Sequence, residues 1–401
     1  MAPSSNTVAP AGPLPSDQPD PTPSHSLPRV RGREQEGVGE ATQRVRRAIG
    51  LMSGTSLDGI DVAMIETDGV SHVVPGPSMT IPYPVDFRES LRNVLGAVGP
   101  VSEVEAELTR LHGDAVAAFV DRHPSLAADI VGMHGHTILH RPAERRTRQL
   151  GDGAALAQRL GIEVVCDFRA ADVAAGGEGA PFAPLYHAAL AAALPKPLAV
   201  LNLGGVGNVT WIGGSEAGEA DAILAFDTGP GNALIDDWVL RHTGAAADFD
   251  GAHARAGRTS EPHVARFLDH PYFARHPPKS LDRDDFHGVI PADLSLADGA
   301  ATLTEITAAA VAAASQHFPA PVREWLVCGG GRHNPALMAA LARLLAAPVR
   351  PVEAVGWDGD ALEAQAFAYL AVRAATGLPL SLPSTTGVPR PMPGGRLYCP
   401  G

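Results

Sequence analysis

The segment Phe226–Asn232 combines residues that could activate a nucleophile beside a phosphate group. A strand-like apolar run precedes it and a helical pattern follows, so we expect Asp227 at a strand end and Gly229 and Gly231 at a helix start. Backbone N–H groups and the helix dipole favour a phosphate there. A carboxylate at this place is kept ionised and could act as a general base. An ordinary strand–turn–helix joint has the same pattern, and the third glycine of a dinucleotide-binding fingerprint is missing.

A second candidate is the turn of residues 54–59, between two short apolar runs. Small residues let a backbone approach a ligand closely, and successive N–H groups can form an anion-binding nest. Thr55 and Ser56 offer hydroxyl donors, while Asp58 and Asp61 could hold a metal-bound water. The alternative is a plain hairpin turn.

Two more glycine-rich segments join expected secondary structure elements. Residues 203–209 lie between two strands, and residues 328–335 lie between a strand and a helix. One joint of this kind is weak evidence for a nucleotide-binding site. Four of them in a chain of alternating strands and helices favour a nucleotide-binding cleft.

Histidines cluster at His134, His136 and His140, after an expected strand. Two histidines in an H-x-H pattern could bind a transition metal. No carboxylate-plus-histidine set completes such a site in the sequence, so a polar strand end that contacts substrate, or a solvated loop, fits as well.

Arg169 stands between Asp167 and Asp172 and is followed by a glycine-rich stretch. A guanidinium in this place could bind a polar ligand that carries a carboxylate. The three side chains could instead form a buried ion-pair network.

The charge composition excludes several classes of protein. The net charge is −13, which disfavours a nucleic-acid-binding protein. Lys196 and Lys279 are the only lysines, and neither completes a P-loop motif. Any phosphate must therefore be bound by backbone N–H groups, arginine or a metal ion.

Other features indicate a cytoplasmic protein. Cys166, Cys328 and Cys399 are too far apart for a zinc ribbon or a disulfide framework. The sequence has no apolar run long enough to span a membrane and no secretory signal pattern. Residues 1–46 are rich in proline and serine, which predicts a disordered tail.

Hydrophobic periodicity predicts an α/β chain with some antiparallel hairpins. Strands at 48–52 and 60–65 should form a hairpin, and Ser102 with Glu105 reads as a capping box that starts a helix ending near Arg122. Further strands are expected at 129–133, 162–166, 198–203, 209–212, 223–226 and 325–328, and further helices at 183–194, 233–241, 302–317, 335–345 and 362–375.

Together the motifs resemble those of one known family, over about residues 48–399. The matching blocks are Leu51–Asp61, His134-Gly135-x-Thr137, Asp167-Phe168-Arg169-x-x-Asp172, Gly176-Gly177-x-Gly179-Ala180-Pro181, Leu201–Gly205, Phe226–Asn232, Pro278-Lys279-Ser280 and Cys328-Gly329-Gly330-Gly331-x-x-Asn334. The family is that of the anhydro-N-acetylmuramic acid kinases.

The resemblance implies an actin-like (ribonuclease H-like) ATPase fold with two α/β domains around a central cleft. The N-terminal domain would comprise residues 47–166 and about 385–399, and the C-terminal domain residues 167–384. The implied enzyme opens 1,6-anhydro-N-acetylmuramic acid with water and phosphorylates O6 with ATP, giving N-acetylmuramic acid 6-phosphate and ADP in peptidoglycan recycling. A homodimer is implied as well, with no nucleic-acid or membrane partner.

The resemblance also implies roles for individual residues. Asp227 matches the catalytic aspartate, and Glu363 matches a glutamate that would hold Mg²⁺ directly or through water. His134, Thr137, Asp167, Arg169 and Asp172 would bind the sugar substrate. ATP would be bound by Gly54, Thr55, Ser56, Leu57, Asp58, Gly59, Ile60, Asp61, Gly229, Gly231, Gly329, Gly330, Gly331 and Asn334.

Two positions depart from the family pattern. His136 replaces the usual glutamine, and Ala170 replaces a frequent second arginine, so the sugar side is where this chain could differ. Two other functions are considered: a metal-dependent hydrolase that uses the H-x-H cluster, and a non-catalytic sugar-sensing protein on the same fold.

Overall fold

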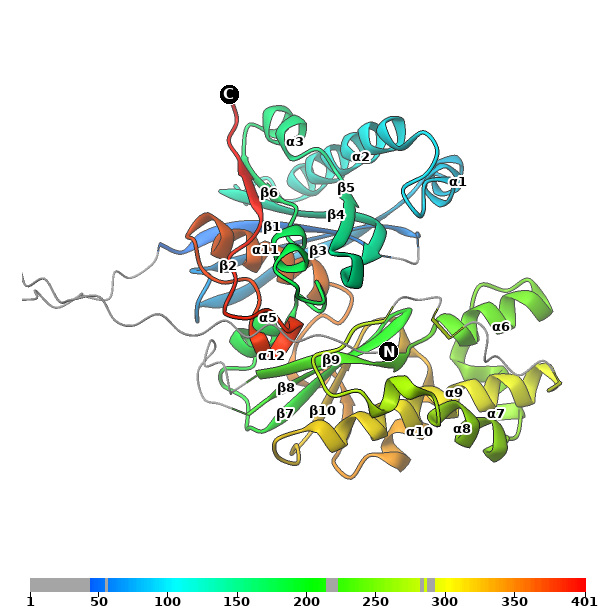
Figure 1. The fold of residues 1–401 in the computed structure, drawn as a ribbon. Helices are drawn as coiled ribbons and strands as arrows, with labels where there is room; N and C mark the ends of the chain where they lie inside the picture. Colours follow the sequence, from blue (N-terminus) through cyan, green and yellow to red (C-terminus); the bar gives the residue numbers. More distant parts are fainter. Residues whose placement is uncertain (1–43, 55–56, 214–222, 282–284, 287–292) are drawn as a thin grey trace, which may run out of the picture. The chain divides into compact units, whose positions relative to one another are not determined.

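The computed structural model describes residues 44–54, 57–213, 223–281, 285–286 and 293–401 (Figure 1). All described residues belong to one compact unit, residues 43–401. Most of the predicted tail therefore lies outside the described residues, and β1 (Arg46–Ser53) begins where the tail was expected to end.

The first sheet has the strand order β12-β6-β4-β1-β2-β3, with β5 paired to β4. Strands β1, β2 and β3 are antiparallel neighbours, whereas β4 runs parallel to β1 and β6 parallel to β4. The remaining strands of this sheet are β2 (Gly59–Thr67), β3 (Val73–Pro82), β4 (Ile130–Arg141), β5 (Arg146–Leu150), β6 (Glu163–Cys166) and β12 (Arg396–Tyr398).

The second sheet repeats this plan with the order β11-β10-β7-β8-β9. Three antiparallel strands come first in the chain, and β10 and β11 then add in parallel beside β7. Its strands are β7 (Leu198–Leu203), β8 (Val206–Ile212), β9 (Ile223–Pro230), β10 (Trp325–Cys328) and β11 (Val349–Pro351). The shared order confirms the predicted two-domain, actin-like α/β fold, while the exact domain boundaries stay a prediction.

Helices cover both faces of each sheet (Figure 1). Successive strand side chains point to opposite faces, so Ala48 packs toward α11 and α5 while Ile49 packs toward α1, α2 and α3. In β7, Val200 likewise faces α5 and α11, and Leu201 faces α9 and α10. The central strands are apolar on both sides because each side is buried.

The helices have the following bounds. They are α1 (Val85–Asn93), α2 (Val101–Arg122), α3 (Gly153–Leu160), α4 (Ala170–Ala174), α5 (Pro184–Leu190), α6 (Ala233–Thr243), α7 (Ala252–Ala256), α8 (Glu261–Leu268), α9 (Leu296–Ala314), α10 (Pro335–Leu344), α11 (Leu362–Ala375) and α12 (Pro383–Thr386). Within the part of the chain that the structure describes, no helix is long and apolar enough to cross a bilayer.

Three local predictions were wrong. The expected capping box is absent: α2 begins at Val101 after Pro100, and the Glu105 carboxylate accepts a hydrogen bond from Gly151 N at 3.1 Å instead. Strand β4 continues to Arg141 because β5 pairs with its second half, so the three histidines lie inside the strand. Strand β9 continues to Pro230 because β8 pairs with it, which places Asp227 and Gly229 within the strand.

Helix α11 lies directly on the first sheet at two glycines. A methyl group at Gly50 of β1 would lie 1.7 Å from Ala364 O, and one at Gly132 of β4 would lie 2.1 Å from Phe367 O. Gly50 and Gly132 are paired across the two strands. Together they form a flat patch that lets the helix backbone touch the sheet.

We expect Gly50→Ala to lower the free energy of unfolding by about 3 kcal/mol or more, because the new methyl group meets backbone atoms that cannot rotate away. Gly204→Ala, whose methyl group would be 3.8 Å from its nearest neighbour, is the control and should change stability little. Urea unfolding of both variants measures this, and equal midpoints would contradict the close approach.

Candidate active site

Asp227 lies on β9, the edge strand of the second sheet next to β8, opposite Asn208. Its side chain is only 5% exposed. Burial raises the pKa of Asp227 to about 7, against the lowering effects of the Leu281 N–H, which donates to Oδ2 at 2.8 Å, and of Arg169. A carboxylate whose pKa lies near neutral pH suits general-base catalysis.

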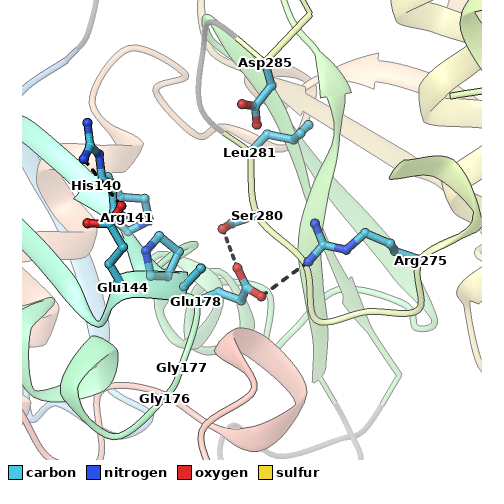
Figure 2. A pocket seen from close by; sticks show the side chains of 12 residues that line it. His140, Arg141, Glu144, Gly176, Gly177, Glu178, Arg275, Ser280, Leu281 and Asp285 are labelled. Carbon is cyan, nitrogen blue, oxygen red and sulfur yellow. Dashed lines mark hydrogen bonds and ion pairs between the residues drawn. The ribbon is translucent and has the colours of Figure 1, made fainter. Parts of the chain in front are cut away.

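A pocket of about 530 Å³ is lined by Glu178, Ser280 and Leu281 among others (Figure 2). The Ser280 hydroxyl donates to the Glu178 carboxylate at 2.7 Å, and the Arg275 guanidinium lies 3.6 Å from the other oxygen of Glu178. Leu281, which also lines the pocket, is the residue whose N–H holds Asp227. The lining residues are His140, Arg141, Pro142, Ala143, Glu144, Gly176, Gly177, Glu178, Arg275, Ser280, Leu281 and Asp285.

Arg169 connects this region to the histidine segment. Its Nε donates to His134 Nε2 at 3.0 Å, and its Nη1 donates to Gly179 O at 2.5 Å. Burial lowers the pKa of His134 well below its ordinary value, so the ring is neutral and can accept this bond. Burial also lowers the pKa of Arg169, against the nearby carboxylates of Glu363, Asp172 and Asp227.

Asp172 fixes the glycine-rich loop that forms one wall of the pocket. Its Oδ1 accepts from Gly179 N at 2.8 Å, and its Oδ2 accepts from the Thr386 hydroxyl of α12 at 2.6 Å. A methyl group at Gly177 would lie 2.2 Å from this carboxylate. The structure thus brings Asp172, Arg169 and His134 together around Gly179.

The other two predicted sugar ligands lie elsewhere. The Thr137 hydroxyl accepts from Gln149 Nε2 at 3.1 Å in the β4–β5 pair. Asp167 forms an ion pair with Arg396 at 3.0 Å and lines a second pocket of about 300 Å³. The structure therefore does not bring these two residues to the Glu178 pocket.

The predicted phosphate-binding turn joins β1 to β2. Leu57 N donates to Gly54 O at 3.2 Å, and Tyr83 N donates to Asp58 O at 2.9 Å. Gly59 is required because a methyl group there would lie 2.4 Å from Ile81 O. Ile60 is buried in the core below the turn. Thr55 and Ser56 lie outside the described residues.

The other glycine-rich joints meet at one end of the second sheet, where β7, β9 and β10 terminate. Gly231 N donates to Gly205 O at 3.0 Å, and Asn232 N donates to Gly204 O at 2.7 Å. A methyl group at Gly331 would lie 2.6 Å from Leu203 Cβ. Residues 203–205, 231–232 and 329–331 thus contact one another at one end of the second sheet.

Of three predicted nucleotide ligands, Gly229 and Asn334 have local structural explanations and Gly330 does not. A methyl group at Gly229 would lie 2.8 Å from Ala310 Cβ of α9, and one at Gly330 would have its nearest neighbour at 3.5 Å, on Asn232. The Asn334 carboxamide oxygen accepts from Ala336 N at 3.0 Å and Leu337 N at 3.2 Å, which caps α10. Of these three, Gly330 alone has open space before it.

Carboxylates gather where the β1–β2 turn approaches α11. Burial raises the pKa of Asp61 to about 6; the Thr80 hydroxyl opposes this, and Asp58, Asp360 and Asp358 raise it further. Burial and Asp61 also raise the pKa of Glu363, in the first turn of α11, although its side chain keeps access to solvent.

This oxygen donor set suits Mg²⁺, which is commonly bound by one or two carboxylates together with substrate phosphates and waters. Considering only the described residues, no three His, Cys, Asp or Glu side chains are placed to hold a metal ion by themselves. The carboxylates fit a cation that arrives with a nucleotide better than a resident one.

The histidines are committed to separate partners. His136 Nδ1 lies 3.0 Å from the Ser53 hydroxyl, His140 Nδ1 lies 3.2 Å from the Thr147 hydroxyl, and His134 accepts from Arg169. Burial lowers the pKa of His136 to about 4. This arrangement gives no support to a metal-dependent hydrolase.

The sequence analysis did not single out Glu178, Arg275 or Ser280 as site residues. Ser280 is a matched residue of the Pro278-Lys279-Ser280 block, which was a usable signal, whereas Glu178 is the unmatched position in the block of residues 176–181. No motif around Arg275 indicates a role in the site. Arg275 is far from Glu178 in the sequence, and the fold brings the two side chains together.

Comparisons with known proteins agree on one family. A family model described as anhydro-N-acetylmuramic acid kinase matches residues 46–400. A relative of that name from Paramagnetospirillum magneticum is 59% identical over 358 residues, which cover 88% of this chain and 99% of the relative. Another, from Acidiphilium cryptum, is 57% identical over 364 residues, with 88% and 98% covered.

Among solved structures, a ROK family glucokinase from Streptomyces griseus in complex with glucose and AMPPNP is 16% identical. The match covers 81% of this chain and 99% of that one at a TM-score of 0.37. A likeness at that score supports no functional conclusion.

We expect Asp227→Asn to stabilise the fold at pH 8 but not at pH 4. The raised pKa means that the folded state binds a proton more tightly than the unfolded state, so the wild type loses stability as the pH rises from about 4 through about 7. Asparagine keeps an acceptor for Leu281 N without the charge. Each kcal/mol recovered should raise Tm by roughly 1–2 °C in a unit of this size.

Thermal unfolding from pH 4 to pH 8 measures this difference. Asp121→Asn, which changes an exposed carboxylate on α2, is the control and should show no such pH-dependent gain. Equal pH dependence in the two variants would contradict the burial of a charged Asp227.

Proposed function

Because the chain belongs to the anhydro-N-acetylmuramic acid kinase family, we propose that it opens 1,6-anhydro-N-acetylmuramic acid with water and phosphorylates O6 with ATP. The products are N-acetylmuramic acid 6-phosphate and ADP, and the reaction serves peptidoglycan recycling. The observation that carries this proposal is the buried Asp227 carboxylate, with a pKa near 7, which accepts a hydrogen bond from Leu281 N at the wall of a polar pocket.

Asp227 acts as the general base. The carboxylate takes a proton from a water molecule while the water oxygen bonds to the anomeric carbon of the sugar. The bond between that carbon and O6 breaks, and O6 keeps the electron pair. O6 then bonds to the γ-phosphorus of ATP, and the bond to the β,γ-bridging oxygen breaks to release ADP. The hydrogen bond from Leu281 N keeps the carboxylate in one orientation throughout.

The sugar occupies the polar pocket that Leu281 lines. Glu178 and Ser280 offer hydrogen-bonding groups to hydroxyl and amide groups, and Arg141 and Arg275 offer positive charge to the acid group of the sugar. His134, Arg169 and Asp172 shape the Gly179 wall of this pocket. We also propose that Thr137 and Asp167 contact the sugar, and only the resemblance to the family supports this.

The nucleotide binds across the glycine-rich joints. The turn of residues 54–61 binds the phosphates through backbone N–H groups, and residues 229–231, 329–331 and Asn334 line the rest of the nucleotide site. Asp61 and Glu363 hold Mg²⁺, directly or through water. When bound, Mg²⁺ neutralises charge on the phosphates and so helps phosphoryl transfer. We also propose a cytoplasmic homodimer.

We expect purified protein with MgATP to release ADP when anhydro-N-acetylmuramic acid is added, and not with glucose, N-acetylglucosamine or N-acetylmannosamine. Asp227→Asn should lose turnover by at least about 10³-fold, because no group then accepts the proton from water, yet still bind ATP. A coupled ADP assay and ATP titration calorimetry measure the two effects.

Absence of stimulation by the anhydro sugar would overturn the substrate assignment. Near-normal turnover of Asp227→Asn would remove Asp227 from the mechanism. ATP binding without turnover for any sugar would favour the sugar-sensing alternative, and stoichiometric zinc or iron with hydrolysis in the absence of ATP would favour the hydrolase.

The pH dependence should report the base. Below about pH 7, kcat/KM for the sugar should fall about tenfold per pH unit, because only deprotonated Asp227 accepts a proton, and it should level off above that pH. Initial rates from pH 5 to pH 9 at saturating MgATP measure this. A flat profile down to pH 5 would contradict a raised pKa at Asp227.

A further inference from the structure

Asp227 belongs to a closed circuit of hydrogen bonds with Tyr272 and Lys279. Asp227 N donates to Lys279 O at 2.9 Å. The Tyr272 hydroxyl donates to Asp227 O, and the Lys279 ammonium donates to Tyr272 O at 3.1 Å. Three elements take part: β9, the short 3₁₀ helix Pro271–Ala274 and the segment 279–281. Each residue contacts the other two, so moving one disturbs both contacts of Asp227.

Lys279 is buried in an unusual setting for a lysine. It is only 3% exposed, and Nζ lies 4.5 Å from the centre of the Tyr272 ring and 5.8 Å from that of Phe226. Ring faces and a carbonyl group stabilise the ammonium through cation–π contact and hydrogen bonding. Burial lowers the pKa of Lys279 to about 8.

The residues after Lys279 reach the active site while its ammonium does not. Ser280 and Leu281 line the pocket, whereas Lys279 is absent from that lining. Ser280 donates to Glu178, and Leu281 N donates to the Asp227 carboxylate. Anchoring Lys279 therefore fixes where the next two residues present their donors.

We propose that Lys279 is a positioning residue for Asp227, and the proposal rests on the base role of Asp227 proposed above. The ammonium holds Tyr272 in place, Tyr272 holds the Asp227 carbonyl, and the Lys279 carbonyl holds the Asp227 N–H. The same anchor keeps the Leu281 N–H on the carboxylate. Since that bond lowers the pKa of Asp227, loosening the anchor raises it.

The experiment compares Lys279→Met, Lys279→Arg and Tyr272→Phe with Lys196→Met. Lys196, the only other lysine, donates to Ala192 O at the surface, so its change is the matched control. Methionine keeps the length of the Lys279 side chain and removes the donor. Arginine keeps a charge but replaces the compact ammonium of this buried side chain with a wider planar group.

Lys279→Met should lower kcat by about 10–100-fold and leave KM for ATP within about twofold of wild type. It should also shift the acid limb of the pH profile to higher pH. Tyr272→Phe should move the limb in the same direction, and the double variant should lose less than the sum of the single losses because both changes break one circuit. Lys279→Arg should resemble Lys279→Met, and Lys196→Met should match wild type.

Hydrogen exchange provides a readout that does not depend on activity. The amide protons of Asp227 and Leu281 should exchange at least about tenfold faster in Lys279→Met and in Tyr272→Phe than in wild type. Unchanged exchange in either folded variant overturns the proposal. A loss confined to KM for the sugar, with the acid limb in place, also overturns it because that result indicates direct substrate contact.

The two proposals can fail separately. If Asp227→Asn stays active, the base role fails, while the exchange measurement still decides whether Lys279 anchors Asp227. If Lys279→Met does not fold, Tyr272→Phe tests the same circuit by itself, and wild-type exchange and pH profile in that variant overturn the proposal.

Discussion

Helix α11 touches the first sheet with its backbone, and much of the site depends on that contact. Gly50 and Gly132 leave no side chain between sheet and helix, so the helix lies about as close as backbone atoms allow. The other side of α11 packs in the same core cluster as Val200 of β7 and Leu326 of β10. The first turn of α11 carries Glu363, whose pKa responds to Asp61 on β2. The helix thus joins the two sheets and fixes the carboxylates at the same time.

The candidate site contains several charges that are partly removed from water. Burial raises the pKa of Asp227 and lowers those of Arg169 and Lys279, so each group is less stable in its charged form than it would be at the surface. Such groups destabilise a fold and are typical of functional sites. The surrounding structure compensates with donors and acceptors from several elements. For Asp227, one N–H from Leu281 leaves the pKa close to neutral pH instead of restoring its usual low value.

Sequence reasoning worked where the determinants were local. The β1–β2 hairpin and helix α11 have the predicted positions because their apolar spacing is read within one segment. It failed where a distant partner decides the outcome. Strand β9 extends beyond Asp227 because β8 pairs with it. Glu105 does not form the expected capping box and instead accepts a hydrogen bond from Gly151 N. Arg275 reaches Glu178 only through the fold, and no spacing rule could find it.

The repeated strand order gives the two sheets glycine-rich turns at equivalent positions, and the proposed phosphate-binding site uses these turns in place of lysine side chains. The turn after β1 and the turn after β7 hold equivalent places in the two sheets, since each joins the first two strands of the antiparallel set. Both turns contain glycines, at Gly54 and Gly59 in the first and at Gly204 and Gly205 in the second. The two sheets differ in the side chains of their third strands, β3 and β9. Asp227 lies on β9, whereas β3, the equivalent strand of the first sheet, has Ser78 and Thr80 directed to carboxylates of the acidic cluster. The second sheet therefore carries the proposed base, whereas Asp61 of the first sheet lies near carboxylates that precede or begin α11.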